Sequence, residues 1–423
     1  MLKAITNKGW KIACVTSLSC LLVAIPISPV AADEALTLKL AVQKTLRQNP
    51  QLHQFKFART RLLAEREANA LKPGYQLGMD AENVAGTGDF SGFGNLEVTV
   101  ALSSVIELGD KRDKRVSVVD TRIDKLELER QAQTLDVLGD VTRVFIQLLT
   151  TQAELQLSSE AVTLSKRLYK TVQTRAKRGA VSDAEVKRAK AMFMQSQLRQ
   201  EGLSYKFERQ KVSLARYWGD TTLPYSKLEG DLSAFGSAVS FTDLYNKVKT
   251  SPAIMVFASE MRLKEAEVRL AKTQNQADLS WQFGVKRLEE SGDTALTLGV
   301  SIPLFAERRN RHRVSAALAE SNAVAYRRSD HLLSLHDQLF TAYSQRQQFI
   351  AAHQRLRDEV IPNLEGALSI TRTGYDRGRL KYQDWIAAQQ ELLSAKQQLI
   401  ETASAALLNQ AVIEQLTAEQ FTQ

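Results

Sequence analysis

Few side chains in this 423-residue sequence are of the types that carry chemistry. The only two cysteines, Cys14 and Cys20, lie close together near the N-terminus. The histidines are His53, His312, His331, His336 and His353, and they form neither an i, i+4 pair nor a His-Glu-x-x-His motif. A nucleophile elbow, a phosphate-binding loop and a paired-cysteine motif are all missing from the sequence. We therefore expect no enzyme, no catalytic residue, no cofactor and no metal site.

Two short stretches stand out by their repetition, "RGAVSDAE" at 178–185 and "RGRLKYQD" at 377–384. Each places Arg-Gly at the end of a long helical pattern and begins a new helix within four residues. Gly179 and Gly378 are expected to supply the left-handed backbone position that follows a helix. Ser182 and Glu185 have the spacing of a capping box, whereas Lys381 replaces the serine in the second turn, which predicts that the box is missing there.

These turns belong to two halves of one duplicated sequence. Asn49-Pro50 corresponds to Ser251-Pro252, Leu96 to Leu296, and Arg178-Gly179 to Arg377-Gly378, at offsets of 202, 200 and 199. We divide the chain into a signal peptide (1–32), a first repeat (33–217), a linker (218–240), a second repeat (241–418) and a tail (419–423). Three lysines before an apolar run, and Val30-Ala31-Ala32 before Asp33, indicate the cleaved signal. Both cysteines lie within it.

Each half reads as helix, β-hairpin, long helix, helix. Apolar and polar residues alternate in "YQLGMDAE", "LEVTVALS" and two matching segments of the second half, which is typical of strands. Segments 110–177 and 311–376 have the apolar spacing of long coiled-coil helices. Four segments have the same spacing over the length of a shorter helix: 36–72, 183–217, 242–275 and 382–416. The glycine-rich segment 83–95 is better read as a hairpin loop than as a nucleotide loop.

The four predicted strands are too few to close a membrane barrel within one chain. Two hairpins supply four strands, and a closed membrane barrel needs at least eight, so several copies must combine, and three would supply twelve. The sequence after residue 32 has no run of 18 apolar residues that would form a spanning helix. The net charge of +9 comes from scattered residues, which argues against a nucleic-acid partner.

From about Leu36 to Glu419 the sequence resembles the TolC-like outer-membrane efflux factors. The resemblance is carried by "LAVQKTLRQNPQL", "VIELGDKRDKR", "RGAVSDAEVKRAKA" and "GYDRGRLKYQDWIAAQQEL". The hairpin from Glu82 to Arg112 resembles the heavy-metal, cobalt-zinc-cadmium branch. This implies a mostly α fold with a transmembrane β part: a trimeric α-helical tunnel plus a 12-stranded β-barrel, with four strands per protomer and two structural repeats.

The resemblance also implies partners and sites. The expected partners are two further copies of the chain, outer-membrane lipid, a periplasmic membrane fusion (adaptor) protein and an inner-membrane RND pump. The chain would form a passive duct in the outer membrane of a Gram-negative cell, and the pump would deliver divalent heavy-metal cations to it. The adaptor-contact residues implied by position are Arg178, Gly179, Ala180, Val181, Ser182, Arg377, Gly378, Arg379 and Leu380. Tyr375 and Asp384 match family gate residues, and the residues alone leave open whether Asp384 caps its helix or faces the lumen.

Two alternatives remain. The same fold serves type I secretion and multidrug export, and a coiled-coil periplasmic structural or adaptor protein would share the long helices. The consistent apolar face of the four strands argues against the second alternative.

Overall fold

The computed structural model describes residues 35–419, so the predicted signal peptide and most of the tail lie outside the described residues. The helices are α1 (Leu38–Gln48), α2 (Pro50–Ala70), α3 (Lys111–Ala176), α4 (Asp183–Ala215), α5 (Phe241–Lys249), α6 (Pro252–Thr273), α7 (Ala306–Arg355), α8 (Ile361–Asp376) and α9 (Tyr382–Thr417). The strands are β1 (Leu36–Thr37), β2 (Gln76–Glu82), β3 (Glu97–Ile106), β4 (Leu228–Glu229), β5 (Leu279–Leu288) and β6 (Thr294–Ser301). None of the helices in this range is both long and apolar enough to cross a membrane.

The two predicted hairpins join into one four-stranded antiparallel sheet in the order β2-β3-β5-β6. Leu102 of β3 pairs with Leu77 on one side and with Phe283 on the other, and Phe283 pairs with Leu298. Because side chains alternate between the faces of a strand, this register gathers the apolar residues of all four strands on one face. That face is exposed in the single chain: Leu77 and Leu298 are 77% and 78% exposed.

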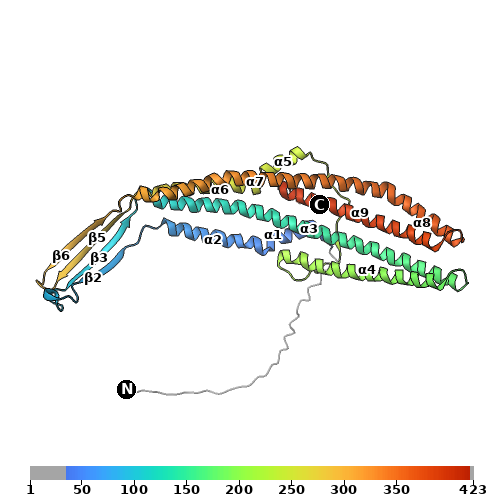
Figure 1. The fold of residues 1–423 in the computed structure, drawn as a ribbon, viewed down its shortest axis with the longest axis horizontal. Helices are drawn as coiled ribbons and strands as arrows, with labels where there is room; N and C mark the ends of the chain where they lie inside the picture. The colour runs from blue at the N-terminus through green and yellow to red at the C-terminus, as the bar shows by residue number, and fades with distance from the viewer. Residues whose placement is uncertain (1–34, 420–423) are drawn as a thin grey trace, which may run out of the picture. The chain divides into compact units, whose positions relative to one another are not determined.

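The helices run from the sheet to two turns at the opposite end (Figure 1). Helices α2 and α4 both pack along the longer α3, while α6 and α9 pack along α7. The α3 helix spans 66 residues, or roughly 100 Å at ~1.5 Å per residue. In the first half, two shorter helices, α2 and α4, thus lie along this one long helix.

Three boundaries differ from the sequence reading. Segment 36–72 divides at Asn49, whose side chain accepts hydrogen bonds from the backbone N–H groups of Gln51 and Leu52 and caps α2. The second long helix changes to a π-helical turn at Leu356–Val360, directly before Pro362, whose ring cannot accept a neighbouring helical turn without adjustment. The linker contributes β4, which pairs in parallel with β1.

Candidate functional site at the two helical turns

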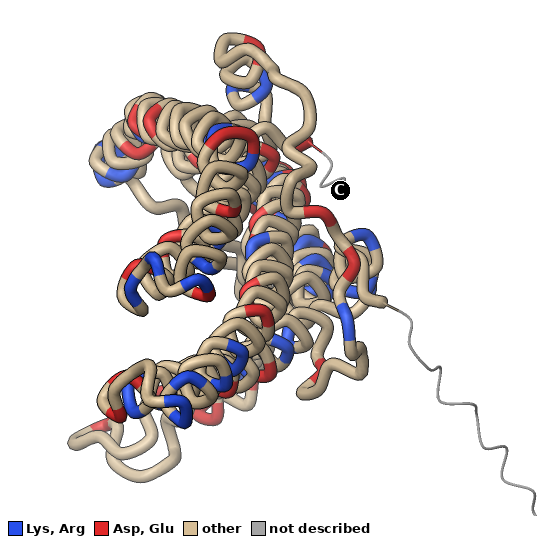
Figure 2. The backbone as a smooth tube through the Cα atoms, turned by 90° about the vertical axis from the view of Figure 1, so that its right-hand side faces the viewer, with Lys and Arg blue, Asp and Glu red and all other residues tan. Residues whose placement is uncertain are grey.

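The two Arg-Gly turns lie together at the end of the bundle that is farthest from the sheet (Figure 1). Figure 2 views the bundle from this end and shows lysine, arginine, aspartate and glutamate positions gathered at both turns. The α3–α4 turn and the α8–α9 turn come from different repeats, so any contact between them joins segments about 200 residues apart.

The first turn closes α3 and begins α4. Gly179 has a φ of +74°, and the Ala180 N–H donates to the Arg175 carbonyl at 3.1 Å, as the left-handed glycine predicts. The Glu185 N–H donates to Ser182 Oγ at 3.4 Å. Glu185 does not return the bond, because its Oε2 is buried with no hydrogen-bond partner among the described residues. The predicted capping box is therefore only half formed.

The second turn repeats this backbone, with Gly378 at a φ of +73° and the Arg379 N–H donating to the Gly374 carbonyl at 2.8 Å. The prediction that the capping box is missing from this turn holds only in part. The Lys381 N–H donates to Asp384 Oδ2 at 2.9 Å, because the carboxylate can complete its half of the box without a serine. Asp384 therefore caps α9, and its side chain remains exposed.

An apolar cluster beneath the turns holds the two helix pairs together. Leu168 and Val172 of α3 and Ala189 of α4 pack with Tyr375 of α8 and with Trp385 of α9. The rings of Tyr375 and Trp385 lie 5.2 Å apart. Tyr375, predicted as a gate residue, is 3% exposed and is therefore a central member of the contact between the repeats.

Arg175 makes the polar connection between the same elements. Its Nη1 donates to the Tyr375 carbonyl at 2.5 Å, and its guanidinium carbon lies 4.3 Å from the centroid of the Tyr375 ring. Arg175 therefore binds both the backbone and the side chain of one residue in the other repeat. No signal in the sequence singled out Arg175, because nothing in its local pattern marks a partner 200 positions away.

The tyrosine hydroxyl groups under the turns are buried without partners. Tyr375 and Tyr382 each have a buried hydroxyl oxygen that lacks a hydrogen-bond partner among the described residues. Burial, reinforced by the negative charge of Glu185, raises the pKa of Tyr382 to about 12. Burial also raises the pKa of Tyr375, although Arg175 opposes the shift. Both phenols are therefore neutral at physiological pH.

The predicted adaptor-contact residues divide into exposed and packed groups. Arg178, Ala180, Ser182, Arg377 and Arg379 are exposed. Of the two apolar residues of the first turn, only Ala180 is fully exposed, because Val181 packs against the cluster under the turns. Leu380 is 36% exposed and its side chain lies against Gly374. The accessible surface of the turns is therefore mostly basic.

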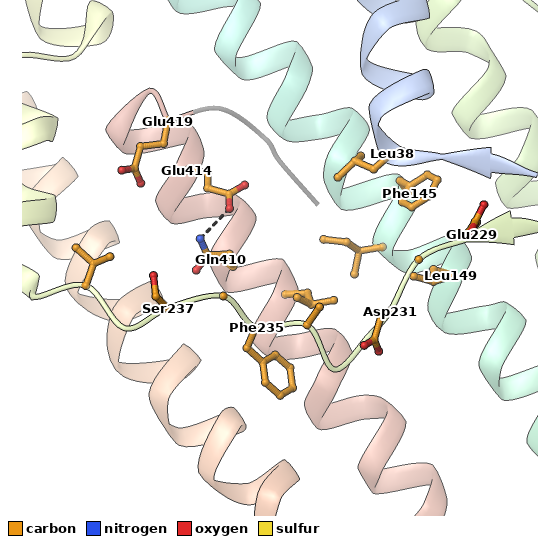
Figure 3. Close-up of a pocket in the computed structure, with 16 residues that line it drawn as sticks. Leu38, Phe145, Leu149, Glu229, Asp231, Phe235, Ser237, Gln410, Glu414 and Glu419 are labelled. Atoms are coloured by element: carbon orange, nitrogen blue, oxygen red, sulfur yellow. Dashed lines mark hydrogen bonds between the residues drawn. The ribbon is translucent and has the colours of Figure 1, made fainter.

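A second concave site of about 740 Å³ lies halfway along the helices, under residues 229–239 of the linker (Figure 3). Its lining includes Phe145 and Leu149 of α3, and Glu414 of α9, which accepts a hydrogen bond from Gln410 at 2.8 Å. Burial raises the pKa of Glu414. Within residues 35–419 no group of three or more histidine, cysteine, aspartate or glutamate side chains is placed to hold a metal ion.

Comparison with known proteins agrees with this architecture. The sequence profile of the family described as outer membrane efflux protein matches residues 41–220 and 245–419. The cobalt-zinc-cadmium resistance protein CzcC of Cupriavidus metallidurans is 22% identical over 298 residues, 70% of this chain and 71% of that protein. The outer membrane protein VceC of Vibrio cholerae has a TM-score of 0.72 at 17% identity, over 91% of this chain and 97% of that chain. The CmeC outer membrane channel of Campylobacter jejuni has a TM-score of 0.73 at 15% identity, over 91% and 87%.

Proposed function

Since the chain belongs to the outer membrane efflux protein family, we propose that it is the outer-membrane channel of a tripartite efflux system. Three copies form one passive exit duct, whose substrates are delivered by an inner-membrane RND pump through a periplasmic adaptor. The two repeats, 33–217 and 241–418, each contribute one hairpin to the membrane part and one pair of helical columns to the periplasmic part, and the linker 218–240 joins them.

The four-stranded sheet is the observation that carries this proposal. Strands β2 and β6 are its two edges within the described residues, and their apolar face is exposed. A long apolar sheet with open edges is not stable in water, because its backbone groups and side chains need partners. Pairing β6 of one copy with β2 of the next, three times, would satisfy both edges in a closed sheet of twelve strands whose apolar face meets lipid.

The helices support the same assembly. Two exposed stripes repeat every seven residues, the spacing of a coiled-coil seam, and α5 reaches the second of them at one end, where the rings of Phe241 and Phe340 lie 5.5 Å apart. They are Ala191, Leu198, Tyr205 and Val212 on α4, and Ala319, Tyr326, Leu333 and Phe340 on α7. Helices of neighbouring copies are the partners that such stripes fit.

Fractionation of cells that express the full chain tests the assembly. Heat-modifiable trimers in the outer-membrane fraction are expected, whereas a monomer in the soluble periplasmic fraction would refute the channel and favour a coiled-coil structural protein. Neighbouring genes for a peptide-exporting ATPase, in place of a pump and an adaptor, would favour the type I secretion alternative.

For the substrate we propose divalent heavy-metal cations. The relative named for cobalt, zinc and cadmium resistance supports this class, and the hairpin between β2 and β3 resembles the same branch. Deletion of the gene should lower tolerance to at least one of zinc, cobalt, cadmium, nickel and copper. Unchanged tolerance to every metal with new sensitivity to organic toxicants would replace the metal assignment by multidrug export and leave the channel intact.

The exposed basic residues of the turns are proposed as the adaptor contact. Arg178 and Arg377 are the matched arginines of the two repeats, and both are exposed. Charge reversal of both should impair export while trimers persist, and the reversal of two exposed lysines on α4, Lys187 and Lys190, is the matched control. Normal export by the Arg178→Glu, Arg377→Glu variant would remove these residues from the contact.

A gate at the same end is the remaining part of the proposal. Tyr375 is held by Arg175, and Asp384 caps α9 at the second turn. Three copies would bring three Asp384 carboxylates around one axis, where they would attract cations. We propose that separation of the two turns in each copy, at the Arg175–Tyr375 contact, widens the duct.

A further inference from the structure

Four arginines at the start of α7 form no ion pair with any other residue that the structure describes. Arg308, Arg309, Arg311 and Arg313 fall within six residues and are all exposed. The ion pairs found within residues 35–419 engage none of the four, although Glu307 precedes them in the same helix. We call this group the arginine collar.

The helix is oriented so that the arginine collar faces away from the bundle. Asn310, in the middle of the group, is 4% exposed and donates to the Ala271 carbonyl at 2.5 Å and to Asn275 Oδ1 at 2.9 Å. Because residues of a helix advance by roughly 100°, Arg308 points to the side opposite Asn310, Arg309 and Arg311 lie on the two flanks, and Arg313 lies roughly 60° from Asn310, at the edge of the packed side. The arginines therefore surround the free surface of the first two turns of α7.

The matching connection of the first repeat uses its charges differently. Both connections place a non-glycine residue with positive φ before the helix, Asp110 at +55° and Phe305 at +61°. After Asp110, Lys111 is 3% exposed and pairs with Asp278 at 2.7 Å, and Arg115 pairs with Glu107. The first repeat thus uses its cations to fasten strand to helix, whereas the second leaves four cations free.

The residues before the arginine collar are apolar and exposed. Ile302, Leu304 and Phe305 are 51%, 69% and 75% exposed. Ile302 and Leu304 continue the alternation of Leu298 and Val300, which lie on the apolar face of β6. In membrane proteins, apolar residues at a strand end contact the lipid hydrocarbon, and the basic residues that follow them lie among the lipid headgroups. The end of β6 and the arginine collar have this arrangement.

We propose that the arginine collar binds the phosphate groups of anionic phospholipids in the membrane leaflet that faces the periplasm. This inference rests on the proposed membrane channel, in which three copies would place twelve arginines in a belt below the sheet. Guanidinium groups bind phosphate oxygens in a bidentate way, which suits a belt that must hold mobile headgroups. The collar would fix the depth of the channel in the membrane.

Lipid selection by the purified full-length protein tests the collar. Wild type and a variant with all four arginines changed to glutamine are reconstituted in vesicles of phosphatidylcholine with phosphatidylglycerol, extracted mildly, and their retained lipids counted by native mass spectrometry. Wild type should retain phosphatidylglycerol in preference to phosphatidylcholine. Each arginine in contact should contribute about fivefold to that preference, the factor that corresponds to ~1 kcal/mol per basic residue at an anionic surface.

Two control variants sharpen the result. Changing all four arginines to lysine keeps the charge and should keep most of the preference. Changing four exposed lysines at the far end, Lys166, Lys170, Lys187 and Lys190, to glutamine removes the same charge and should leave it unchanged. Inorganic phosphate, added as a competitor at the concentration of lipid phosphate, should not displace the retained phosphatidylglycerol.

Four outcomes would overturn the proposal. The first is an equal lipid preference in wild type and the variant with four glutamines at the collar, and the second is an equal loss of preference when the four far-end lysines are changed to glutamine. The third is displacement of phosphatidylglycerol by inorganic phosphate. The fourth is dissociation of the collar variant into monomers, which would assign the arginines to a contact with a neighbouring copy. Failure of wild type to insert as a trimer would refute the proposed channel and the collar with it. Normal insertion with no lipid preference would refute the collar alone.

Discussion

Replacement of Arg175 by glutamine should favour separation of the two helical turns in each chain. Arg175 is the only side chain for which we find both a hydrogen bond and a ring contact to Tyr375 within residues 35–419. Glutamine removes the positive charge and is too short to keep both contacts. The backbone hydrogen bonds within each turn do not involve this side chain and should remain.

The expected magnitude follows from the two contacts that are lost. A hydrogen bond from a charged donor contributes about 1.5–3 kcal/mol, and a cation–π contact at a partly exposed site about 0.5–1 kcal/mol. Arg175 is partly exposed, so we take the lower ends, which together make about 2 kcal/mol. At about 1.4 kcal/mol per factor of ten, the ratio of open to closed states should rise roughly 30-fold.

Single-channel recording of purified trimers in planar lipid bilayers measures this ratio directly. Arg178→Gln is the matched control, because Arg178 is an exposed arginine of the same turn. A Tyr375→Leu variant removes the ring but keeps the carbonyl that Arg175 binds. The cycle of single and double variants cancels the loss of packing against Trp385 and should give a coupling of about 0.5–1 kcal/mol between Arg175 and the ring. An unchanged ratio in Arg175→Gln, with normal trimers and an unchanged melting temperature, would refute the idea that this contact holds the turns together.

Further predictions concern the tyrosines, the glycines and the proposed trimer. Because the pKa of Tyr382 is raised from 10.0 to about 12, its burial contributes stability that is complete below pH 10 and is lost as pH rises to about 12. Tyr382→Phe should reduce that loss of stability in alkaline denaturation. An identical pH profile of stability would contradict the raised pKa of Tyr382. Gly179→Ala and Gly378→Ala should each lower the free energy of unfolding by about 1–2 kcal/mol, because both positions have positive φ. Gly202→Ala, at an exposed position inside α4, should instead raise it by about 0.5–1 kcal/mol, and a loss there would show that the backbone argument fails. Tyr205→Glu should weaken trimers in sedimentation while the helical content persists, and Ser204→Glu, next to the stripe, should not.

The family and the mostly helical, TolC-like fold class were predicted correctly from local patterns. Alternation in "YQLGMDAE" located β2, and apolar spacing from 110 to 177 located α3 within one residue at each end. Such features depend on neighbouring residues alone, since helix and strand periods are short. The left-handed glycines at 179 and 378 were predicted for the same reason.

The turns show where local reasoning failed. The sequence reading assigned a full capping box to the first turn and none to the second, but the structure forms one half of a box in each, through Ser182 and through Asp384. A motif shows which side chains are able to form the bonds, but in the structure Oε2 of Glu185 is buried without a hydrogen-bond partner among the described residues. Val181 likewise faces the cluster under the turns instead of solvent.

By itself the sequence determined the duplicated order of elements, the length of α3 and the apolar face of each strand, because each depends on side chains a few positions apart. Only the tertiary structure decided which distant segments meet. It pairs β3 with β5 across the two repeats and brings Arg175 to Tyr375, and it leaves the arginines of α7 free where Lys111 of α3 is buried. Such contacts depend on the packing of whole helices and strands, which no local period encodes.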